Sequence, residues 1–414
     1  MKMMEGAGLE VAFEPDGEFF DTDQPVYVVV NTCGFIGDAK EESISEILSW
    51  CRARREGAIE GLYVMGCLPV RYMDELKAEI PEVDAWRGKT DWPELVKLIA
   101  GRHPGQTPYD RVLTTPRHHA YIKIAEGCDR MCAFCAIPLI TGRYRSRTIE
   151  DIVDEARRLA ARGVKELNVI AQDLTSYGKD IYGRVEIARL VDALADVEGI
   201  EWIRLHYAYP NEFPMDLLDV MARRDNVCKY LDIALQHASD KVLSAMRRHI
   251  TLAETETLLA EIRRRVPGIH LRTTLMTGFP GEGEAEFEEL MDFVKRQRFE
   301  RMGAFAYCAE DGTYAERNYD DSVPDEVKHR RQDTLMALQE EISAEIQAEK
   351  VGRVMKVVID REEPEYYVGR TEFDSPEVDP EVLVKKDRTL QRGEFYNVRI
   401  TEAMPYELIG EVVN

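Results

Sequence analysis

Short apolar runs alternate with helical stretches through the middle of the chain. Six runs rich in β-branched and aromatic residues are each too short for a helix, and they lie at 121–125, 166–171, 202–207, 230–235, 271–277 and 302–307. Between them, apolar residues recur at helical spacing at 148–162, 185–197, 214–224, 252–265 and 284–296. Strands that alternate with helices form a parallel sheet, because each helix returns the chain to the start of the next strand. The pattern therefore predicts a partial (β/α)6 barrel.

The same alternation appears earlier in the chain. Apolar runs at 26–31 and 62–65 flank a helical stretch, which predicts a parallel pair of strands joined by a right-handed crossover. Cys33 and Cys67 each come just after one of these strands, at the edge where open α/β sheets bind ligands. The spacing leaves two interpretations open, a shared metal site or two inert thiols. Cys51 falls on the apolar face of the helix and is expected to pack in the core.

Two further patterns follow the barrel. Residues 324–350 carry leucine and isoleucine at helical spacing, which predicts a long helix against the barrel. Short apolar runs separated by turn residues then predict a small antiparallel β-barrel, with strands at 355–359, 366–368, 382–384, 396–400 and 408–413. Residues 101–117 contain three prolines and few apolar residues and predict a linker. We therefore expect an incomplete Rossmann-like α/β domain at 1–110, the barrel at 114–348 and the small β-barrel at 349–414.

Composition narrows the choice of function. Hydrophobic residues make up 44% of the 414 residues, which is enough for several cores, and no apolar run approaches the roughly 18 residues of a membrane-spanning helix. We expect a cytoplasmic protein without a membrane partner. The 54 basic and 77 acidic residues give a net charge of −23. Proteins that hold nucleic acid through its phosphates need a basic face, so this balance favours a basic protein partner over nucleic acid.

Three cysteines form the most informative motif. Cys128, Cys132 and Cys135 are separated by three and then two residues, so their thiols can converge on one metal centre. They leave that centre one ligand short of four, and a four-iron cluster held by three thiolates keeps one iron open for a substrate or cofactor. Structural zinc prefers four closed ligands, and no second cysteine pair lies nearby. His118 and His119 precede the first barrel strand, so they would have to cross its full length to supply a fourth ligand.

This motif, with Phe134 just before its last cysteine, resembles that of the radical S-adenosylmethionine superfamily. The resemblance implies a [4Fe–4S] cluster on Cys128, Cys132 and Cys135, with S-adenosylmethionine on the open iron and Phe134 beside it. One electron from such a cluster splits S-adenosylmethionine to a radical that removes hydrogen from an unactivated carbon. The resemblance also implies an electron donor such as flavodoxin or ferredoxin.

Other segments resemble one family of this superfamily, the methylthiotransferases. They are Val-Asn-Thr-Cys-Gly-Phe-Ile at 30–36, Gly-Cys-Leu at 66–68, Pro-Arg-His-His-Ala-Tyr at 116–121, Ala-Gln-Asp-Leu-Thr-Ser-Tyr-Gly at 171–178, Leu-Gln-His-Ala-Ser at 235–239 and Gly-Phe-Pro-Gly-Glu at 278–282. These segments are most similar to the branch that adds a methylthio group to the β-carbon of an aspartate in small-subunit ribosomal protein twelve. The C-terminal barrel resembles the TRAM domain.

The resemblance further implies a second [4Fe–4S] cluster on three N-terminal cysteines. Cys33 and Cys67 match two of these cysteines, and no cysteine matches the third. We expect the chain to be an N-terminally shortened version of a complete protein, because a Rossmann-like sheet without its first strand exposes an unpaired edge. A natural variant with a weakened second cluster is the other interpretation.

Polar residues gather at the predicted strand ends, where parallel barrels place their chemistry. Gln172 and Gln236 are expected to contact the cofactor, although hydrogen bonds that close a strand end explain them nearly as well. Three arginines at 143–147 are candidates to meet a carboxylate of the substrate or cofactor, and a solvated loop is the alternative. Cys228 and Cys308 are expected in the core.

Two other functions stay open. The tRNA-modifying branch of the methylthiotransferases shares both cysteine motifs, but it differs in what its C-terminal barrel binds. Residues 351–414 hold nine basic and fourteen acidic residues, and this charge suits a basic ribosomal protein better than phosphates. A non-catalytic metal-binding adaptor, with zinc on Cys128, Cys132 and Cys135, is the alternative of another class. The polar strand ends argue against it, because an adaptor does not need them.

Overall fold

The chain folds into two compact units. A computed structural model describes residues 1–13, 22, 24–34, 37–101 and 111–413. The smaller unit comprises Met1–Thr114, Cys135–Gly142 and Glu310–Thr313, and the larger comprises Thr115–Phe134, Arg143–Ala309 and Tyr314–Asn414. Residues 35–36 of the first cysteine motif and residues 102–110 of the predicted linker lie outside the described ranges. Among the helices described, none has the length and apolar composition needed to cross a membrane.

The smaller unit is built on a parallel three-stranded sheet. Its strands, in the spatial order β1-β2-β3, are β1 (Tyr27–Thr32), β2 (Gly61–Gly66) and β3 (Ala85–Gly88). Its helices are α1 (Lys2–Gly6), α2 (Gly37–Arg55), α3 (Cys67–Glu79), α4 (Trp92–Ala100) and α5 (Ile137–Thr141). The predicted unit of strand, helix and strand is confirmed as β1, α2 and β2. The sequence pattern missed β3, because Ala-Trp-Arg-Gly contains no apolar run.

The central strand β2 is buried on both faces. Leu62 and Val64 contribute to one core together with Cys51 of α2. Tyr63 and Met65 contribute to another core, which includes residues of α1 and α4. This two-residue alternation is typical of a strand covered by helices on both sides. Cys51, which is 1% exposed, is therefore a core residue, as the sequence predicted.

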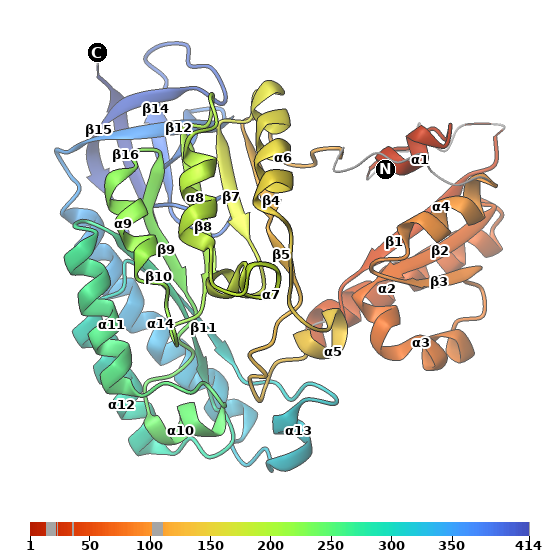
Figure 1. Cartoon of the computed structure of the whole chain (residues 1–414), viewed down its shortest axis with the longest axis horizontal. Coiled ribbons are helices and arrows are strands. Elements are labelled where there is room, and N and C mark those ends of the chain that lie inside the picture. Colours follow the sequence, from red (N-terminus) through yellow and green to blue (C-terminus); the bar gives the residue numbers. More distant parts are fainter. Residues whose placement is uncertain (14–21, 23, 35–36, 102–110, 414) are drawn as a thin grey trace. The chain divides into compact units, whose positions relative to one another are not determined.

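The larger unit contains a six-stranded parallel sheet (Figure 1). In the spatial order β11-β10-β9-β8-β7-β4, its strands are β4 (His119–Lys123), β7 (Glu166–Ile170), β8 (Trp202–Ala208), β9 (Val227–Ile233), β10 (His270–Thr277) and β11 (Arg301–Ala306). The main connecting helices are α6 (Ile149–Ala161), α8 (Ile187–Ala195), α9 (Asp216–Arg223), α11 (Leu252–Arg265) and α12 (Glu284–Gln297). Shorter elements are β5 (Ala125–Glu126), β6 (Arg145–Ser146), α7 (Lys179–Tyr182), α10 (Asp240–Ala245), α13 (Tyr314–Asn318) and the 3₁₀ helix Leu174–Ser176.

All six predicted strands and all five predicted helices of this sheet are present. The strands β4 and β9 begin earlier than predicted, because a polar residue interrupts each apolar run. His119 opens β4 and Lys229 lies near the start of β9. His119 is nevertheless buried, so tertiary packing extends these two strands beyond their apolar stretches.

Helix α14 (Asp325–Ala348) packs against β10 and β11 and leads into a closed β-barrel. The strands of this barrel, in the spatial order β12-β13-β14-β16-β15, are β12 (Val354–Glu362), β13 (Tyr366–Thr371), β14 (Glu381–Lys385), β15 (Phe395–Ala403) and β16 (Glu407–Val412). The five predicted strands are confirmed, with one departure from the antiparallel prediction. β14 and β16 run parallel. Strand direction cannot alternate all the way around a closed ring of five, so one parallel pair is unavoidable.

The closed barrel covers the amino-terminal ends of the sheet strands through buried ion pairs. Glu166 of β7 accepts hydrogen bonds from Arg370 of β13 at 2.7 Å and from Arg204 of β8 at 3.0 Å. Arg370 also pairs with Asp360 of β12 at 2.7 Å, and Asp360 contacts His118 Nε2 at 2.7 Å. Burial by itself raises the pKa of the Glu166 carboxyl, but Arg370 and Arg204 outweigh burial and lower this pKa to about 2. The carboxylate therefore stays charged and paired at neutral pH.

A loop of the closed barrel, residues 371–379, meets the same end of the sheet. The Tyr230 hydroxyl of β9 donates to Asp379 at 2.8 Å, and Arg301 of β11 pairs with the buried Asp374 at 2.5 Å. In Figure 1 the closed barrel, drawn in blue, lies at this end of the sheet. Paired side chains thus occupy much of the amino-terminal end, and parallel sheets of this kind place their chemistry at the carboxyl end.

Replacing Arg370 tests this network. We expect Arg370→Met to lower the free energy of unfolding by about 3–5 kcal/mol, because it leaves the Glu166 and Asp360 carboxylates buried without their cation. Arg361→Met is the matched control on β12, since the Arg361 side chain is 43% exposed and its ion pairs contribute about 0–1 kcal/mol. Urea unfolding followed by tryptophan fluorescence measures both variants. Equal losses of stability would contradict a buried network at this junction.

Candidate functional site

The Cys128 motif lies at the carboxyl end of the six-stranded sheet. Strand β4 ends at Lys123, and the pairing of β5 with β6 leads into the motif. Because the six strands are parallel, the carboxyl ends of the other five lie at the same end of the sheet. Cys128 and Cys132 are half-buried. Cys135, three residues further along the chain, is also half-buried and belongs to the smaller unit.

Two charged residues inside the motif hold its loop in place. Asp129 accepts a hydrogen bond from Arg143 Nε at 2.7 Å. Arg130 Nε donates to Asp173 at 2.6 Å, and Asp173 also accepts hydrogen bonds from the backbone N–H and the hydroxyl of Thr175. The motif is therefore tied to the segment before β6 and to the loop after β7.

Hydrogen-bond donors point at the sulfurs of Cys128 and Cys132. The Arg130 N–H lies 3.5 Å from Cys128 Sγ, and Arg248 Nη1 lies 3.3 Å from Cys132 Sγ. Sulfur accepts such bonds best as a thiolate, which is also the form that binds metals. Burial raises the pKa of the Cys128 thiol to about 11, so burial by itself favours the neutral thiol over the thiolate that binds metals. The donor set fits a thiolate-bound metal centre.

The three predicted cofactor contacts lie in different settings. Gln172, after β7, donates to Glu126 at 3.0 Å, while its own buried Oε1 has no partner among the described residues. Gln236, after β9, has a left-handed φ of 76° and forms a parallel bridge to β10. Phe134 packs edge to face on Phe279, with ring centroids 6.4 Å apart. Their contacts with a cofactor stay predictions.

Left-handed backbone conformations gather at this end of the sheet. Eight non-glycine residues in the described part of the chain have a positive φ, and six of them lie in the segments that end or follow β5, β8 and β9, namely Met131, Tyr207, Glu212, Gln236, Arg247 and His249. Each such conformation costs on the order of 1 kcal/mol and persists only where the surrounding structure maintains it. Their concentration here supports a functional site.

Cys33 and Cys67 form the second group of thiols, in the smaller unit. Each follows the last residue of a strand, and those last residues, Thr32 and Gly66, are register partners. A Cβ on Gly66, whose φ is 118°, would lie 2.3 Å from the Thr32 carbonyl oxygen. A Cβ on Gly34 would lie 2.7 Å from the backbone of the residue after Cys67. Only glycine permits these approaches, so the backbone at Gly34 lies against the junction of β2 and α3 at Cys67.

Side chains from two helices fix the Cys33 loop. Ser43 of α2 accepts a hydrogen bond from the Cys33 N–H at 3.1 Å and donates to the Cys33 carbonyl at 3.2 Å. Arg71 of α3 donates to the Gly34 carbonyl at 2.8 Å and pairs with Glu310 at 3.1 Å. The Arg71 side chain is 5% exposed. The backbone of the exposed Cys33 and of Gly34 is thus anchored by side chains of α2 and α3.

Known proteins resemble the chain over its whole length. It matches the Radical SAM superfamily at 122–294, the TRAM domain at 351–413 and "Uncharacterized protein family UPF0004" at 9–88. It is 58% identical to "Ribosomal protein uS12 methylthiotransferase RimO" of Parabacteroides distasonis, over 94% of this chain and 90% of that protein. The protein of the same name in Phocaeicola vulgatus is 54% identical over 100% of this chain and 95% of its own length. The chain belongs to the RimO family of methylthiotransferases.

Solved structures support the fold. The radical S-adenosylmethionine methyltransferase TsrM from Kitasatospora setae, solved with cobalamin and a [4Fe–4S] cluster, has a TM-score of 0.57 at 18% identity, over 72% of this chain and 67% of its own. The cobalamin-dependent S-adenosylmethionine radical enzyme OxsB has a TM-score of 0.50 at 14% identity, and the match covers 78% of this chain and 48% of the OxsB chain. The resemblance to radical S-adenosylmethionine methylthiotransferases that the motifs predicted is confirmed by the RimO relatives, and the fold by these structures.

Three residues near the motif escaped the sequence prediction. Arg130 lies inside the cysteine motif and Tyr209 follows the end of β8, so both positions carried a signal. The position of Arg248 gave no such sequence signal, because Arg248 follows the short helix α10 and does not directly follow a strand. In this RimO-family chain, only tertiary folding brings Arg248 to Cys132.

Two of the three arginines at 143–147 have local partners. Arg143 is 89% exposed and pairs with Asp129 of the motif. Arg147 pairs with Glu155 of α6 at 2.6 Å and donates to a backbone carbonyl of β4. Both side chains are thereby occupied in holding the chain. The predicted contact with a substrate or cofactor carboxylate gains no support from this geometry.

Of the two cysteines predicted for the core, one is buried. Cys228 of β9 is 1% exposed, which confirms the prediction. Cys308 is exposed, so the prediction was wrong for it. The preceding residue, Tyr307, is buried, and successive side chains of an extended segment point to opposite sides.

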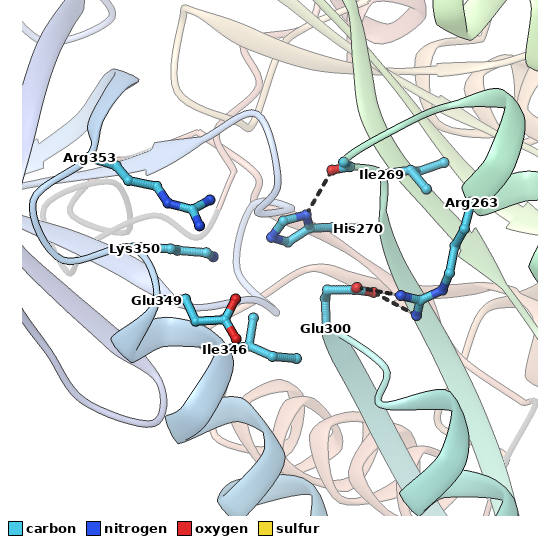
Figure 2. Close-up of a pocket in the computed structure, with 9 residues that line it drawn as sticks. Arg263, Ile269, His270, Glu300, Ile346, Glu349, Lys350 and Arg353 are labelled. Atoms are coloured by element: carbon cyan, nitrogen blue, oxygen red, sulfur yellow. Dashed lines mark hydrogen bonds and ion pairs between the residues drawn. The ribbon is translucent and has the colours of Figure 1, made fainter.

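A separate cavity of about 240 Å³ lies at the other end of the sheet. Figure 2 shows Arg263, His270, Glu300 and Lys350 among the residues that line it. Arg263 pairs with Glu300 at 3.0 Å. His270 begins β10 and Glu300 directly precedes β11, so the cavity opens at the amino-terminal ends of these strands. It lies away from the Cys128 motif.

One further group has the spacing of metal ligands. The candidate ligand atoms of His118, His119 and Asp360 all lie within 4.8 Å of one another. Arg370 donates to Asp360 at 2.9 Å, and a guanidinium at that position repels a metal cation. His119 also begins β4, so these histidines lie at the opposite end of the strand from Cys128. We assign the group to the ion-pair network of the junction.

Alanine at Gly66 tests the close approach of the two cysteine loops. We expect Gly66→Ala to lower the free energy of unfolding by about 1–3 kcal/mol more than Gly142→Ala, because its new Cβ overlaps Thr32. Gly142 is the matched control, since its φ of 72° and ψ of −155° lie in the same glycine-only region as the φ of 118° and ψ of −151° of Gly66, but no atom lies within 4 Å of its Cβ position. Urea unfolding measures both variants. Equal destabilisation would contradict the packed loops.

Proposed function

We propose that the chain is a radical S-adenosylmethionine methylthiotransferase that adds a methylthio group to the β-carbon of an aspartate in ribosomal protein uS12. The observation that carries this proposal is the identity of 54–58%, over nearly the whole chain, to proteins named for this activity. The cysteine motif at the carboxyl end of a parallel sheet supports an enzyme over a metal-binding adaptor, since such sheets place their chemistry at that end. We assign the reaction to the cytoplasm, where ribosomes are assembled.

In this proposal, Cys128, Cys132 and Cys135 are the ligands of a [4Fe–4S] cluster that binds S-adenosylmethionine at its open iron. When bound, these groups supply a radical that removes hydrogen from an unactivated carbon. The chain stabilises the thiolates by hydrogen bonds, from the Arg130 N–H to Cys128 and from the Arg248 guanidinium to Cys132.

Gln172, Gln236 and Phe134 complete the proposed cofactor site. The buried Oε1 of Gln172 is an acceptor suited to the ammonium or the adenine amino group of S-adenosylmethionine. Gln236 lies on a strand end whose left-handed backbone the fold maintains at a cost. Phe134 and the buried Phe279 form an apolar surface behind the motif, which keeps water from a radical reaction.

Cys33 and Cys67 are the proposed ligands of a second [4Fe–4S] cluster, which supplies or relays the sulfur. Gly34 and Gly66 let the backbone beside Cys33 lie against the start of α3 at Cys67, which supports a shared ligand. Cys51 does not complete this set, because it is buried in the core beneath α2. The methyl group comes from a second molecule of S-adenosylmethionine.

Charge supports the choice of partner. The net charge of −23 favours a basic protein such as a ribosomal protein over the phosphates of tRNA. The electron comes from a small donor protein such as flavodoxin or ferredoxin. Nucleic acid has no part in the proposed reaction.

Substitution of a motif cysteine tests the enzyme assignment. After anaerobic reconstitution with iron and sulfide, we expect Cys128→Ala to lose the release of 5′-deoxyadenosine from S-adenosylmethionine, because one cluster ligand is missing. Cys308→Ser is the matched control, since Cys308 is outside both motifs and exposed. Chromatographic assay of the nucleoside measures both variants. Colourless, zinc-loaded protein that never releases the nucleoside would support the adaptor instead.

The substrate is tested by mass analysis of ribosomal proteins from cells with and without the gene. We expect uS12 to carry the mass of one methylthio group only where the gene is present. Binding of tRNA and of uS12 at two salt concentrations is the companion measurement. Tight tRNA binding that falls steeply with salt, together with unmodified uS12, would favour the tRNA branch.

A further inference from the structure

Two arginines contact one tyrosine beside the Cys128 motif. The guanidinium of Arg130 lies 4.3 Å from the centre of the Tyr209 ring, and that of Arg248 lies 4.0 Å from it. The face of an aromatic ring attracts cations, so Tyr209 holds two like charges close together. The same residues reach the motif sulfurs, since Tyr209 OH lies 3.8 Å and Arg248 Nη1 lies 3.3 Å from Cys132 Sγ.

The two arginines differ in how their charge is compensated. Arg130 forms an ion pair with Asp173 at 2.6 Å. Arg248 is 3% exposed, and its guanidinium donates to the Ala234 carbonyl and to Cys132 Sγ, with no carboxylate partner among the described residues. Its buried Nε has no partner in the same part of the chain. A buried cation is costly unless negative charge lies nearby, so Arg248 is placed to meet an anionic group at Cys132.

The backbone holds Arg248 at this place. Its neighbours on both sides have left-handed conformations, with φ of 58° at Arg247 and 54° at His249. The Ala133 N–H inside the motif donates to the Met246 carbonyl at 2.9 Å, and Tyr209 OH donates to the Arg248 carbonyl at 3.0 Å. Two unfavourable conformations in three residues persist only because tertiary contacts maintain them.

We propose that Arg248 is a positioning residue of the Cys128, Cys132 and Cys135 cluster: it donates a charge-assisted hydrogen bond to the Cys132 thiolate and raises the reduction potential of the cluster. This inference rests on the proposed function, because it requires that cluster. Reduction transfers one electron from the donor protein to the cluster and adds one negative charge. A cation that is hydrogen-bonded to a ligand sulfur stabilises this more negative state.

The test is a redox titration of the full chain followed by electron paramagnetic resonance. A background of Cys33→Ala with Cys67→Ala leaves one cluster to titrate after reconstitution with iron and sulfide. We expect Arg248→Gln to lower the ratio of reduced to oxidised cluster at a fixed potential about tenfold, which corresponds to about 59 mV for a one-electron couple. Arg248→Lys keeps the charge but loses the forked geometry, so its ratio is expected to fall between those of the unsubstituted chain and Arg248→Gln.

Arg247→Gln is the matched control. It removes the same charge from the adjacent residue, whose guanidinium lies 4.2 Å from the centre of the Tyr314 ring. We expect it to leave the potential unchanged. An unchanged potential in both Arg248 variants, or an equal shift in Arg247→Gln, overturns the inference.

Iron content per chain separates the remaining outcomes. If Arg248→Gln holds no cluster, Arg248→Lys decides: a lowered potential supports the inference and an unchanged potential overturns it. If the chain with native Arg248 takes up no cluster in either the full-cysteine or the Cys33→Ala, Cys67→Ala form, the proposed function fails and the inference fails with it. If the native chain binds the cluster but its reduction potential does not change on substitution of Arg248, the inference is overturned and the proposed function stands.

Discussion

The common direction of the six strands is the constraint on which the larger unit depends. It gives the sheet two ends of different character, because every strand begins at one end and finishes at the other. The closed barrel packs against the amino-terminal end, where Glu166, Arg204 and Arg370 pair in a buried network. The carboxyl end, which is the second end, carries the cysteine motif and most of the left-handed residues. We therefore place the proposed chemistry at the second end, since much of the first end is used for packing.

The smaller unit follows the same rule with fewer strands. Its two motif cysteines, Cys33 and Cys67, directly follow Thr32 and Gly66, which are paired across the adjacent parallel strands β1 and β2, so strand pairing alone brings both cysteines to the same end of the sheet. Glycine then sets how closely the two segments approach, since any side chain at Gly66 would overlap Thr32. Both units thus present thiols at the carboxyl ends of parallel strands, and this repetition follows from the way such sheets are connected.

The buried arginines of this protein fall into two groups that differ in the partner of their charge. Arg204, Arg301 and Arg370 each meet a buried carboxylate, and such arginines hold the closed barrel on the sheet. Arg248 is equally buried but meets a cysteine sulfur and the oxygen of a carbonyl. A cation whose compensation is incomplete within the described chain indicates a place for a further anionic group. The contrast separates arginines that hold the fold together from Arg248, for which we propose a role at the cluster.

The sequence by itself determined the order of the elements, the parallel sheets, the closed barrel and the position of both cysteine motifs, because hydrophobic periodicity and short motifs are local properties of a chain. It failed for β3, whose four residues contain no apolar run, and for Cys308, whose exposure depends on its neighbours. Only the tertiary structure decided the partners of buried charges. Arg248 and Cys132 are 116 residues apart, and no local pattern reports a contact that folding alone creates.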